Sequence, residues 1–268
     1  MVESIIDLQI KVSAIVVGRN EGAKLHNCFA SLQWCDEILY ADLNSRDKSL
    51  EIAEAFGCSI YQYSVFGPAG EYTQSKLMDK VRNEWVLLLD PDEVLSDSLI
   101  KDINVTLKVV AKDFQIGSIE LPWQFYFGRH RLLGTVWGGE KYKEILVHRN
   151  RFDVLPITHY GRRRKAGFEK YTIRRMGENI IHHYWMDDIS SFISKHHKYL
   201  RDEGRDRYNR GERVNLLKII LCIPYQFLYS YIKMRGYKDG FIGLFLSIFW
   251  AYYIFRCYTS LYSIARKI

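Results

Sequence analysis

Short apolar runs alternate with helix-like patterns along the N-terminal third of the chain. Four runs are too short for helices and predict buried strands: residues 11–17 (KVSAIVV), 37–41 (EILYA), 58–63 (CSIYQY) and 85–89 (WVLLL). Three helices are predicted between these strands. The first contains Leu25, Cys28, Phe29 and Leu32, which recur at helical spacing, and the other two cover residues 48–56 and 72–82. This order predicts an α/β fold with a Rossmann-like, doubly wound, mostly parallel sheet.

The predicted strands end in polar residues that would share one edge of the sheet. The run Trp85 to Leu89 ends abruptly in Asp90-Pro91-Asp92-Glu93, where Pro91 cannot continue a hydrogen-bonded ladder. The first two strands end in Arg19-Asn20-Glu21 and Asp42. Open α/β sheets bind their ligands at the carboxyl ends of the strands. These residues are therefore candidates for a binding site.

Two carboxylates one residue apart, Asp90 and Asp92, remain ionised together most easily beside a cation. Hard oxygen ligands suit Mg²⁺ or Mn²⁺, and these cations in turn suit a diphosphate. The alternative is an acidic turn that caps the next helix, because Ser96-Asp97-Ser98 follows. The position behind a buried strand favours the metal site.

After residue 97 the sequence first predicts further helices and strands, and then becomes strongly apolar towards its C-terminal end. It predicts a helix over residues 98–112, strands over 118–123, 144–148 and 179–185, and a helix from Ile189 that Asp187 or Asp188 caps. After a polar stretch come two apolar blocks, residues 214–232 and 241–255. We therefore predict a domain over residues 1–205 and a helical region over 206–268.

The apolar blocks carry interruptions and basic flanks. Lys218 and Pro224 interrupt the first block, and Arg256 follows the second, which is shorter than the roughly 20 residues of a spanning helix. Arg210, Arg213, Lys233, Arg235 and Lys238 lie around them. This pattern predicts helices that attach peripherally to the cytoplasmic face of a membrane. The alternative is a helical pair packed on the α/β domain.

Composition narrows the class of protein. The chain has 268 residues, 48% hydrophobic residues and a net charge of +7, which allows a large core and anionic partners. Five cysteines without a Cys-x-x-Cys pair indicate free thiols of a reducing compartment. The N-terminus lacks the basic region of a signal peptide, so we expect a cytoplasmic domain. The first loop has neither a Gly-x-Gly-x-x-Gly nor a Walker pattern, which disfavours nicotinamide-binding domains and phosphate-loop ATPases.

An ordered series of motifs resembles the family 2 glycosyltransferases, which are inverting enzymes of the GT-A type. The likeness is carried by residues 13–21 (SAIVVGRNE), 31–38 (SLQWCDEI), 42–47 (DLNSRD) and 85–93 (WVLLLDPDE). A weaker likeness follows in His183-Tyr184 and in residues 235–244. Within the family, the chain is most similar to the branch of lipopolysaccharide-core sugar transferases.

The resemblance implies a hexosyltransferase-like enzyme that uses a nucleoside-diphosphate sugar, with a UDP-sugar as first choice. Arg19, Asn20, Glu21 and Asp42 would flank the base and ribose, and Asp90 would lie near the ribose and the metal. Asp92, with Asp90 and His183, would bind Mg²⁺ or Mn²⁺ through the diphosphate. The acceptor would be a lipid-linked or lipopolysaccharide-type glycan at the membrane surface, and nucleic acid is not an expected partner.

The catalytic base departs from the family pattern. Relatives of this branch usually show His-Glu or His-Asp after a late strand, where this chain reads Thr158-His159-Tyr160. A neutral tyrosine is a poor base at pH 7 because its usual pKa is about 10. The candidates that remain open are His159, Glu140, Asp153 and Glu169, and the further alternative is that activity is lost. The basic run of residues 162–165 is a solvated segment, holds a loop over the diphosphate or meets a phosphorylated glycolipid.

Two other classes compete with the sugar transferase. A nucleotidyltransferase also uses strand-end carboxylates and Mg²⁺, but it normally needs a Gly-rich, basic loop that residues 17–21 barely supply. A non-enzymatic basic module for membranes or nucleic acid would not place its best-organised polar residues, which are acidic, at one sheet edge. Binding of nucleotide-linked sugars in the presence of Mn²⁺ separates the three classes.

Overall fold

The computed structural model describes residues 10–64, 70–155 and 161–266. The chain divides into two units, one made of residues 1–123 and 142–183, the other of residues 124–141 and 184–268. This division differs from the predicted boundary at residue 205, because the helix from Ile189 groups with the C-terminal helices. The assignment of residues 1–205 to one functional domain stays a prediction.

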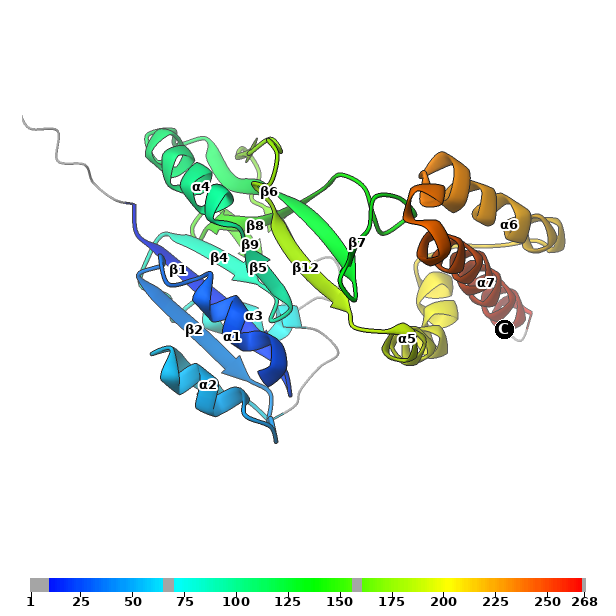
Figure 1. Ribbon diagram of the computed structural model, residues 1–268, viewed down its shortest axis with the longest axis horizontal. Helices are drawn as coiled ribbons and strands as arrows, with labels where there is room; N and C mark the ends of the chain where they lie inside the picture. Colours follow the sequence, from blue (N-terminus) through cyan, green and yellow to red (C-terminus); the bar gives the residue numbers. More distant parts are fainter. Residues whose placement is uncertain (1–9, 65–69, 156–160, 267–268) are drawn as a thin grey trace, which may run out of the picture. The chain divides into compact units, whose positions relative to one another are not determined.

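The main sheet has the strand order β3-β2-β1-β4-β8-β6-β12-β5, and β11 and β7 also pair with β6 (Figure 1). The strands are β1 (Val12–Gly18), β2 (Glu37–Asp42), β3 (Ser59–Gln62), β4 (Trp85–Leu89), β5 (Glu93–Leu95), β6 (Ile116–Phe127), β7 (His130–Arg131), β8 (Lys141–His148), β11 (Glu169–Thr172) and β12 (Ile181–Met186). A separate two-stranded sheet pairs β9 (Phe152–Val154) with β10 (Arg162–Arg164). Strands β3, β2, β1 and β4 run parallel, as predicted, whereas β8 pairs antiparallel with β4.

Helices pack on the parallel part of the sheet and supply the core of the first unit. They are α1 (Gly22–Ala30), α2 (Ser49–Ala55), α3 (Gly70–Leu77) and α4 (Asp97–Val110). All five residues of β4 are buried, which explains why its sequence is continuously apolar. The Ser96 hydroxyl accepts a hydrogen bond from the Leu99 N–H at 3.2 Å and starts α4. The predicted fold class, α/β with a mostly parallel sheet and a helical C-terminal region, is confirmed.

The second unit is mainly helical. Its helices are α5 (Ile189–Asn209), α6 (Leu216–Leu228), the π-helix η1 (Tyr229–Lys233), the 3₁₀-helix η2 (Gly236–Asp239) and α7 (Gly240–Ala265). Asp188 caps α5 by accepting a hydrogen bond from the Ser191 N–H at 2.7 Å. An aromatic cluster holds α5, α7 and the segment before β8 together: Trp137, Trp185, Phe192, His196, Phe249 and Trp250.

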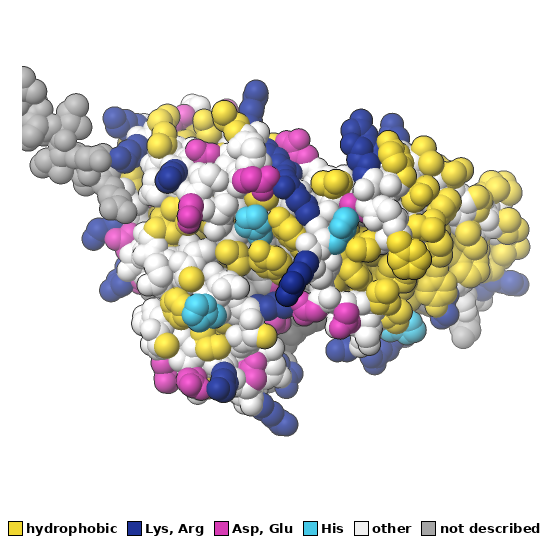
Figure 2. Space-filling model, viewed as in Figure 1, with side chains coloured by type: hydrophobic (Ala, Val, Ile, Leu, Met, Phe, Trp, Pro, Cys, Tyr) yellow, Lys and Arg dark blue, Asp and Glu magenta, His cyan; other side chains and the backbone are white. Residues whose placement is uncertain are grey.

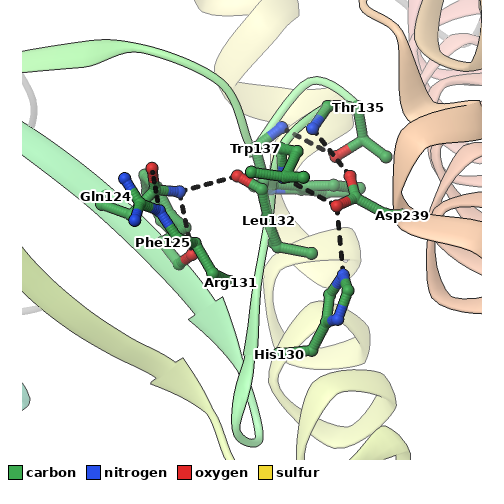
Figure 3. Close-up of polar contacts among 10 residues, drawn as sticks. Gln124, Phe125, His130, Arg131, Leu132, Thr135, Trp137 and Asp239 are labelled. Carbon is green, nitrogen blue, oxygen red and sulfur yellow. Dashed lines mark hydrogen bonds and ion pairs between the residues drawn. The ribbon is translucent and has the colours of Figure 1, made fainter. Parts of the chain in front are cut away.

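A buried carboxylate fastens the start of α7 to the loop after β7. Asp239 accepts hydrogen bonds from the backbone N–H groups of Leu133 and Gly134, both at 2.7 Å, and lies 3.1 Å from His130 Nε2 (Figure 3). Asp239 is 3% exposed, so these bonds replace the water that the carboxylate loses on burial. Residues that are far apart in the sequence thereby form one structure in the second unit.

Helix α7 extends beyond the apolar block of residues 241–255. It continues through Arg256 to Ala265, and α6 likewise runs through Pro224. By length and composition alone, Gly236–Ala265 is the one helical segment of the described chain that is long and apolar enough to cross a membrane. Its most apolar window is 39% buried within the protein, and the core helix of a soluble protein meets the same criteria.

Candidate functional site

The carboxyl ends of β1, β2 and β4 meet as the sequence predicts. In the parallel register Gly18 lies beside Asp42, and β4 ends just before Asp90. A Cβ atom built on Gly18 would lie 3.2 Å from Pro91 Cγ and 3.2 Å from the Tyr40 hydroxyl oxygen. A glycine at the end of β1 therefore lets the loop after β4 come close to the ends of β1 and β2.

The loops after β1 and β2 are tied to each other by hydrogen bonds. The Asn20 N–H donates to Ser45 Oγ at 2.9 Å, and the Arg46 N–H donates to Asn20 Oδ1 at 2.7 Å. Asn20 and Asn44 have φ angles of 57° and 62°, a left-handed conformation that asparagine tolerates better than most residues. Such conformations are often found at binding sites, where the surrounding contacts hold them.

Asp42 lies at the base of a polar cavity formed by these loops. Its side chain is buried and accepts hydrogen bonds from the Ser45 N–H at 3.0 Å and from the Tyr40 hydroxyl at 3.3 Å. The cavity has a volume of about 260 Å³ and is lined by Asp42, Asn44, Ser45, Leu50, Gln62, Tyr63 and Ser64. A carboxylate, amide and hydroxyl groups beside a tyrosine ring offer both hydrogen bonds and a stacking surface to a polar ring system.

The loop after β4 contains a network of acids around one lysine. Lys143 Nζ on β8 donates to Asp90 Oδ2 at 2.7 Å and to Glu93 Oε1 at 2.6 Å. Burial favours a higher pKa for Asp90, but the charges of Lys143 and Arg162 outweigh it and lower the pKa to about 2. Burial raises the pKa of Glu93 even though Lys143 acts in the opposite direction. Asp90 is therefore a carboxylate at neutral pH.

Asp92 faces the histidine that the resemblance placed beside the metal. His183 Nε2 on β12 lies 3.3 Å from Asp92 Oδ2. In the antiparallel pairing of β12 with β5, His183 is directly opposite Glu93, so the register fixes this contact. The His183 imidazole stacks on the Trp123 indole with a centroid distance of 4.9 Å. The structure thus brings His183 next to the loop of Asp90 and Asp92, although His183 is far from that loop in the sequence.

The structure gives less support to the other predicted site residues. Arg19 is exposed, and Glu21 is half-buried at the start of α1, where its N–H donates to Ser49 Oγ at 3.1 Å. Among the base candidates, Glu140 is exposed and belongs to the second unit, and His159 lies outside the described residues. Asp153 on β9 lies 3.6 Å from Arg163 Nε and 3.8 Å from Lys165 Nζ.

Glu169 is exposed at the start of β11. The identity of the base therefore stays a prediction.

The sequence singled out the basic run that begins at Arg162, but it did not single out Lys143. The Arg162 guanidinium on β10 donates to Gln74 Oε1 on α3 at 2.7 Å, and its charge contributes to the low pKa of Asp90. In the structure, residues 162–164 of this run form a strand. At least one arginine of this run thus lies near the carboxylates.

The residues after β4 suit a divalent cation that is shared with a ligand. The Asp92 side chain is 19% exposed and can present oxygen to a bound ion next to His183. Mg²⁺ commonly binds through one or two carboxylates and completes its octahedron with water and substrate phosphates. Among the described residues, no three His, Cys, Asp or Glu side chains are grouped as a complete metal site. A cation here would rely on phosphate oxygens as well.

Comparison with known proteins identifies a class of relatives. No family model matches the chain. A curated protein of Rickettsia bellii, described as an uncharacterised glycosyltransferase, is 21% identical over 269 residues, which cover 90% of this chain and 83% of the relative. A protein of Rickettsia typhi with the same description is 22% identical over 270 residues, which cover 96% and 88%.

One relative has a more specific name. The lipopolysaccharide core biosynthesis glycosyltransferase LpsC of Rhizobium meliloti is 23% identical over 268 residues, covering 95% of this chain and 93% of LpsC. The expected resemblance to glycosyltransferases, including the lipopolysaccharide-core branch, is confirmed.

Solved structures are more distant. TarS of S. aureus, residues 1–349, gives a TM-score of 0.48 at 12% identity and covers 96% of this chain and 92% of that one. Glucosyl-3-phosphoglycerate synthase of Mycobacterium tuberculosis, solved with Mn²⁺, UDP and glucosyl-3-phosphoglycerate, gives 0.37 at 15% identity, covering 53% and 57%.

Proposed function

We propose that the protein is an inverting, metal-dependent family 2 glycosyltransferase that uses a nucleoside-diphosphate sugar, with UDP as the first choice of nucleotide. The observation that carries this proposal is the meeting of Asp42, Asp90 and Asp92 at one sheet edge, beside a polar cavity. The full-length similarity to curated glycosyltransferases supports the same class. The proposed acceptor is a hydroxyl of a lipid-linked or lipopolysaccharide-type glycan.

In this proposal, two parts of the sheet edge bind different parts of the nucleotide sugar. The polar cavity at Asp42 holds the base and ribose, and the loop from Asp90 to Asp92 holds the diphosphate. When bound, Mg²⁺ or Mn²⁺ neutralises charge on the departing diphosphate. The acceptor oxygen bonds to the anomeric carbon as the bond to the diphosphate oxygen breaks, and a base takes the hydroxyl proton. Attack from the face opposite the diphosphate inverts the anomeric centre.

Replacing Asp42 with alanine is expected to weaken the binding of UDP and of UDP-sugars about equally, by about ten- to a hundredfold, because a hydrogen bond to a charged group contributes roughly 1.5–3 kcal/mol. The Asp42→Asn variant keeps the shape of the side chain and separates loss of charge from loss of the loop bonds. Calorimetry with UDP-, GDP- and CMP-linked compounds in Mn²⁺ measures the effect and identifies the preferred nucleotide.

The control for this experiment is Glu54→Ala, which removes an exposed acid from α2. It should bind nucleotide like the wild type. Equal nucleotide affinity of the Asp42→Ala variant would show that the cavity is not the nucleotide site. A protein that binds none of these compounds would contradict the proposed class.

The second unit supports the membrane part of the proposal. Side chains of α6 and η1 expose a continuous apolar face: Leu216, Leu217, Ile220, Leu221, Ile223, Leu228 and Ile232 (Figure 2). Exposed basic residues flank this face in the sequence, and Lys218 lies within it: Arg210, Arg213, Lys218, Lys233, Arg235 and Lys238. An apolar face with a basic rim suits an anionic lipid surface, where each basic residue adds about 1 kcal/mol.

A groove in the same face suits an apolar lipid chain. Its volume is about 520 Å³, and it is lined by Leu217, Leu221, Tyr225, Tyr258 and neighbouring residues, with Lys218 among them. The Lys218 ammonium lies 4.9 Å from the centroid of the Tyr258 ring, so a cation stands beside the groove where a lipid phosphate would be stabilised. We accordingly place the protein at the cytoplasmic face of the cytoplasmic membrane.

We expect the wild type to float with anionic liposomes and the double variant Ile220→Glu, Leu221→Glu to bind them at least about tenfold more weakly, because charged groups resist burial among acyl chains. Ile220 and Leu221 are 68% and 53% exposed, so the substitutions leave the core intact. The matched control is Val105→Glu, Val109→Glu on α4, where both side chains are similarly exposed. If all three proteins stay at the bottom of the gradient, the apolar face does not bind membranes.

A further inference from the structure

Strand register brings a lysine to the acidic loop. In the antiparallel pairing of β4 with β8, Leu87 is opposite Leu146; counting three residues onward from this pair reaches Asp90, just past the end of β4, and Lys143 on β8. The Lys143 side chain is 14% exposed, and its ammonium binds Asp90 and Glu93 at 2.7 and 2.6 Å. The Glu93 side chain is fully buried. A cation thus already occupies the space between two of the three acids of this loop.

The same lysine is connected to the remaining acid through an aromatic stack. Lys143 Nζ lies 4.9 Å from the Trp123 ring centroid, and the His183 imidazole stacks on Trp123 at an interplanar angle of 12°. His183 in turn lies 3.3 Å from Asp92. The cluster therefore has two ends: at one end Asp90 and Glu93 are paired with Lys143, and at the other end Asp92 is paired with His183.

We propose that Lys143 is a positioning residue that occupies the cation position at Asp90 and Glu93 and so directs the divalent cation to Asp92 and His183. This inference rests on the proposed function. A hard cation gains affinity with every carboxylate that ligates it. By engaging two carboxylates, Lys143 keeps the free protein from binding the metal tightly, and the metal then enters together with the diphosphate.

The test is metal binding without nucleotide. We expect Lys143→Met to bind Mn²⁺ alone at least about tenfold more tightly than the wild type, because Asp90 and Glu93 become available as ligands. Lys143→Arg keeps the positive charge and should resemble the wild type. Calorimetric titration with MnCl₂ measures all three proteins, and repeating it in the presence of UDP should reduce the difference between them.

The outcome that overturns the inference is Mn²⁺ affinity of the methionine variant equal to or below that of the wild type. If the unpaired, buried Glu93 carboxylate prevents the Lys143→Met variant from folding, the double variant Lys143→Met, Glu93→Gln is used instead. This double variant also frees Asp90 from Lys143, so it should also bind Mn²⁺ more tightly than the wild type. The MnCl₂ titration without nucleotide tests the role of Lys143. If neither the wild type nor any variant binds UDP, the proposed function is contradicted, but the comparison of their Mn²⁺ affinities still tests the role of Lys143.

Discussion

Replacement of Asp92 with alanine is expected to reduce sugar transfer by about 10³-fold and to abolish the dependence of nucleotide binding on Mn²⁺. Removing one group that stabilises developing charge in an active site costs about 10²–10³-fold in rate, and a lost metal ligand adds to this. Asp92 is the carboxylate of the loop that faces His183 and that Lys143 does not engage. It is therefore the residue on which a shared cation depends most.

The measurement is transfer of radiolabelled sugar from the nucleotide that binds best, together with calorimetry in the presence and absence of Mn²⁺. Asp92→Asn keeps the side-chain volume and a neutral oxygen, and it should lose nearly as much activity because the charge is missing. Asp79→Ala removes an exposed acid after α3 and should keep full activity. Transfer by the Asp92→Ala variant at the wild-type rate would refute the metal site proposed here.

The parallel half of the sheet could be predicted because β1, β2 and β4 are buried at nearly every position, whereas β3 at its edge is partly exposed. Residues 85–89 were predicted as a strand, and β4 has those bounds with all five side chains buried. The helix after it was predicted from the spacing of Leu99, Ile100, Ile103, Leu107 and Val110, and all of these except Ile100 are buried. In this half of the chain, local pattern and tertiary environment agree, so periodicity is sufficient.

The antiparallel strands and their site residues were harder to predict. Asp90 and Asp92 were found because a buried run ends at them, but Lys143 drew no attention in a strand with several charged residues. The available signal was its period-2 relation to Ile145 and Val147, both fully buried. Its partner Asp90 lies more than fifty positions away, and only the β4–β8 register brings them together.

The apolar block of residues 241–255 is shorter than helix α7, which continues through Arg256 to Ala265. In the structure the Arg256 guanidinium carbon lies 6.0 Å from the centroid of the exposed Tyr252 ring, so the charge remains at the surface while the helix continues. A long side chain on an exposed helix face does not interrupt the backbone. The length of an apolar run therefore underestimates the length of a helix that has only one buried face.

The second large effect is expected for Gly243→Ala in the first turn of α7. A Cβ atom on Gly243 would lie 1.8 Å from the carbonyl oxygen of Gly236 and 2.9 Å from Asp239 Cβ. The backbone of η2 cannot yield as a flexible side chain would, so α7 must move away from it. That movement also disturbs Asp239, whose carboxylate holds the loop after β7 (Figure 3). We expect a loss of about 3 kcal/mol or more in the free energy of unfolding.

For a chain of this size such a loss lowers the melting temperature by roughly 6–12 °C, which circular dichroism of the full-length protein measures. Phe241→Ala is the matched control: it lies two residues away in the same turn, its side chain is 77% exposed, and it should change stability by less than about 0.5 kcal/mol. A second variant, Gly204→Ala, tests the contact of α7 with α5, because a Cβ there would lie 2.2 Å from Ser260 Oγ and 2.6 Å from Ser260 Cβ on α7. The hydroxyl can rotate away but the Cβ cannot, so Gly204→Ala should also destabilise the protein; it should do so less than Gly243→Ala, because the nearest backbone atom, Leu261 N, would be 3.1 Å away. Melting of the Gly243→Ala variant at the wild-type temperature would mean that α7 and η2 are not packed as closely as the structure places them.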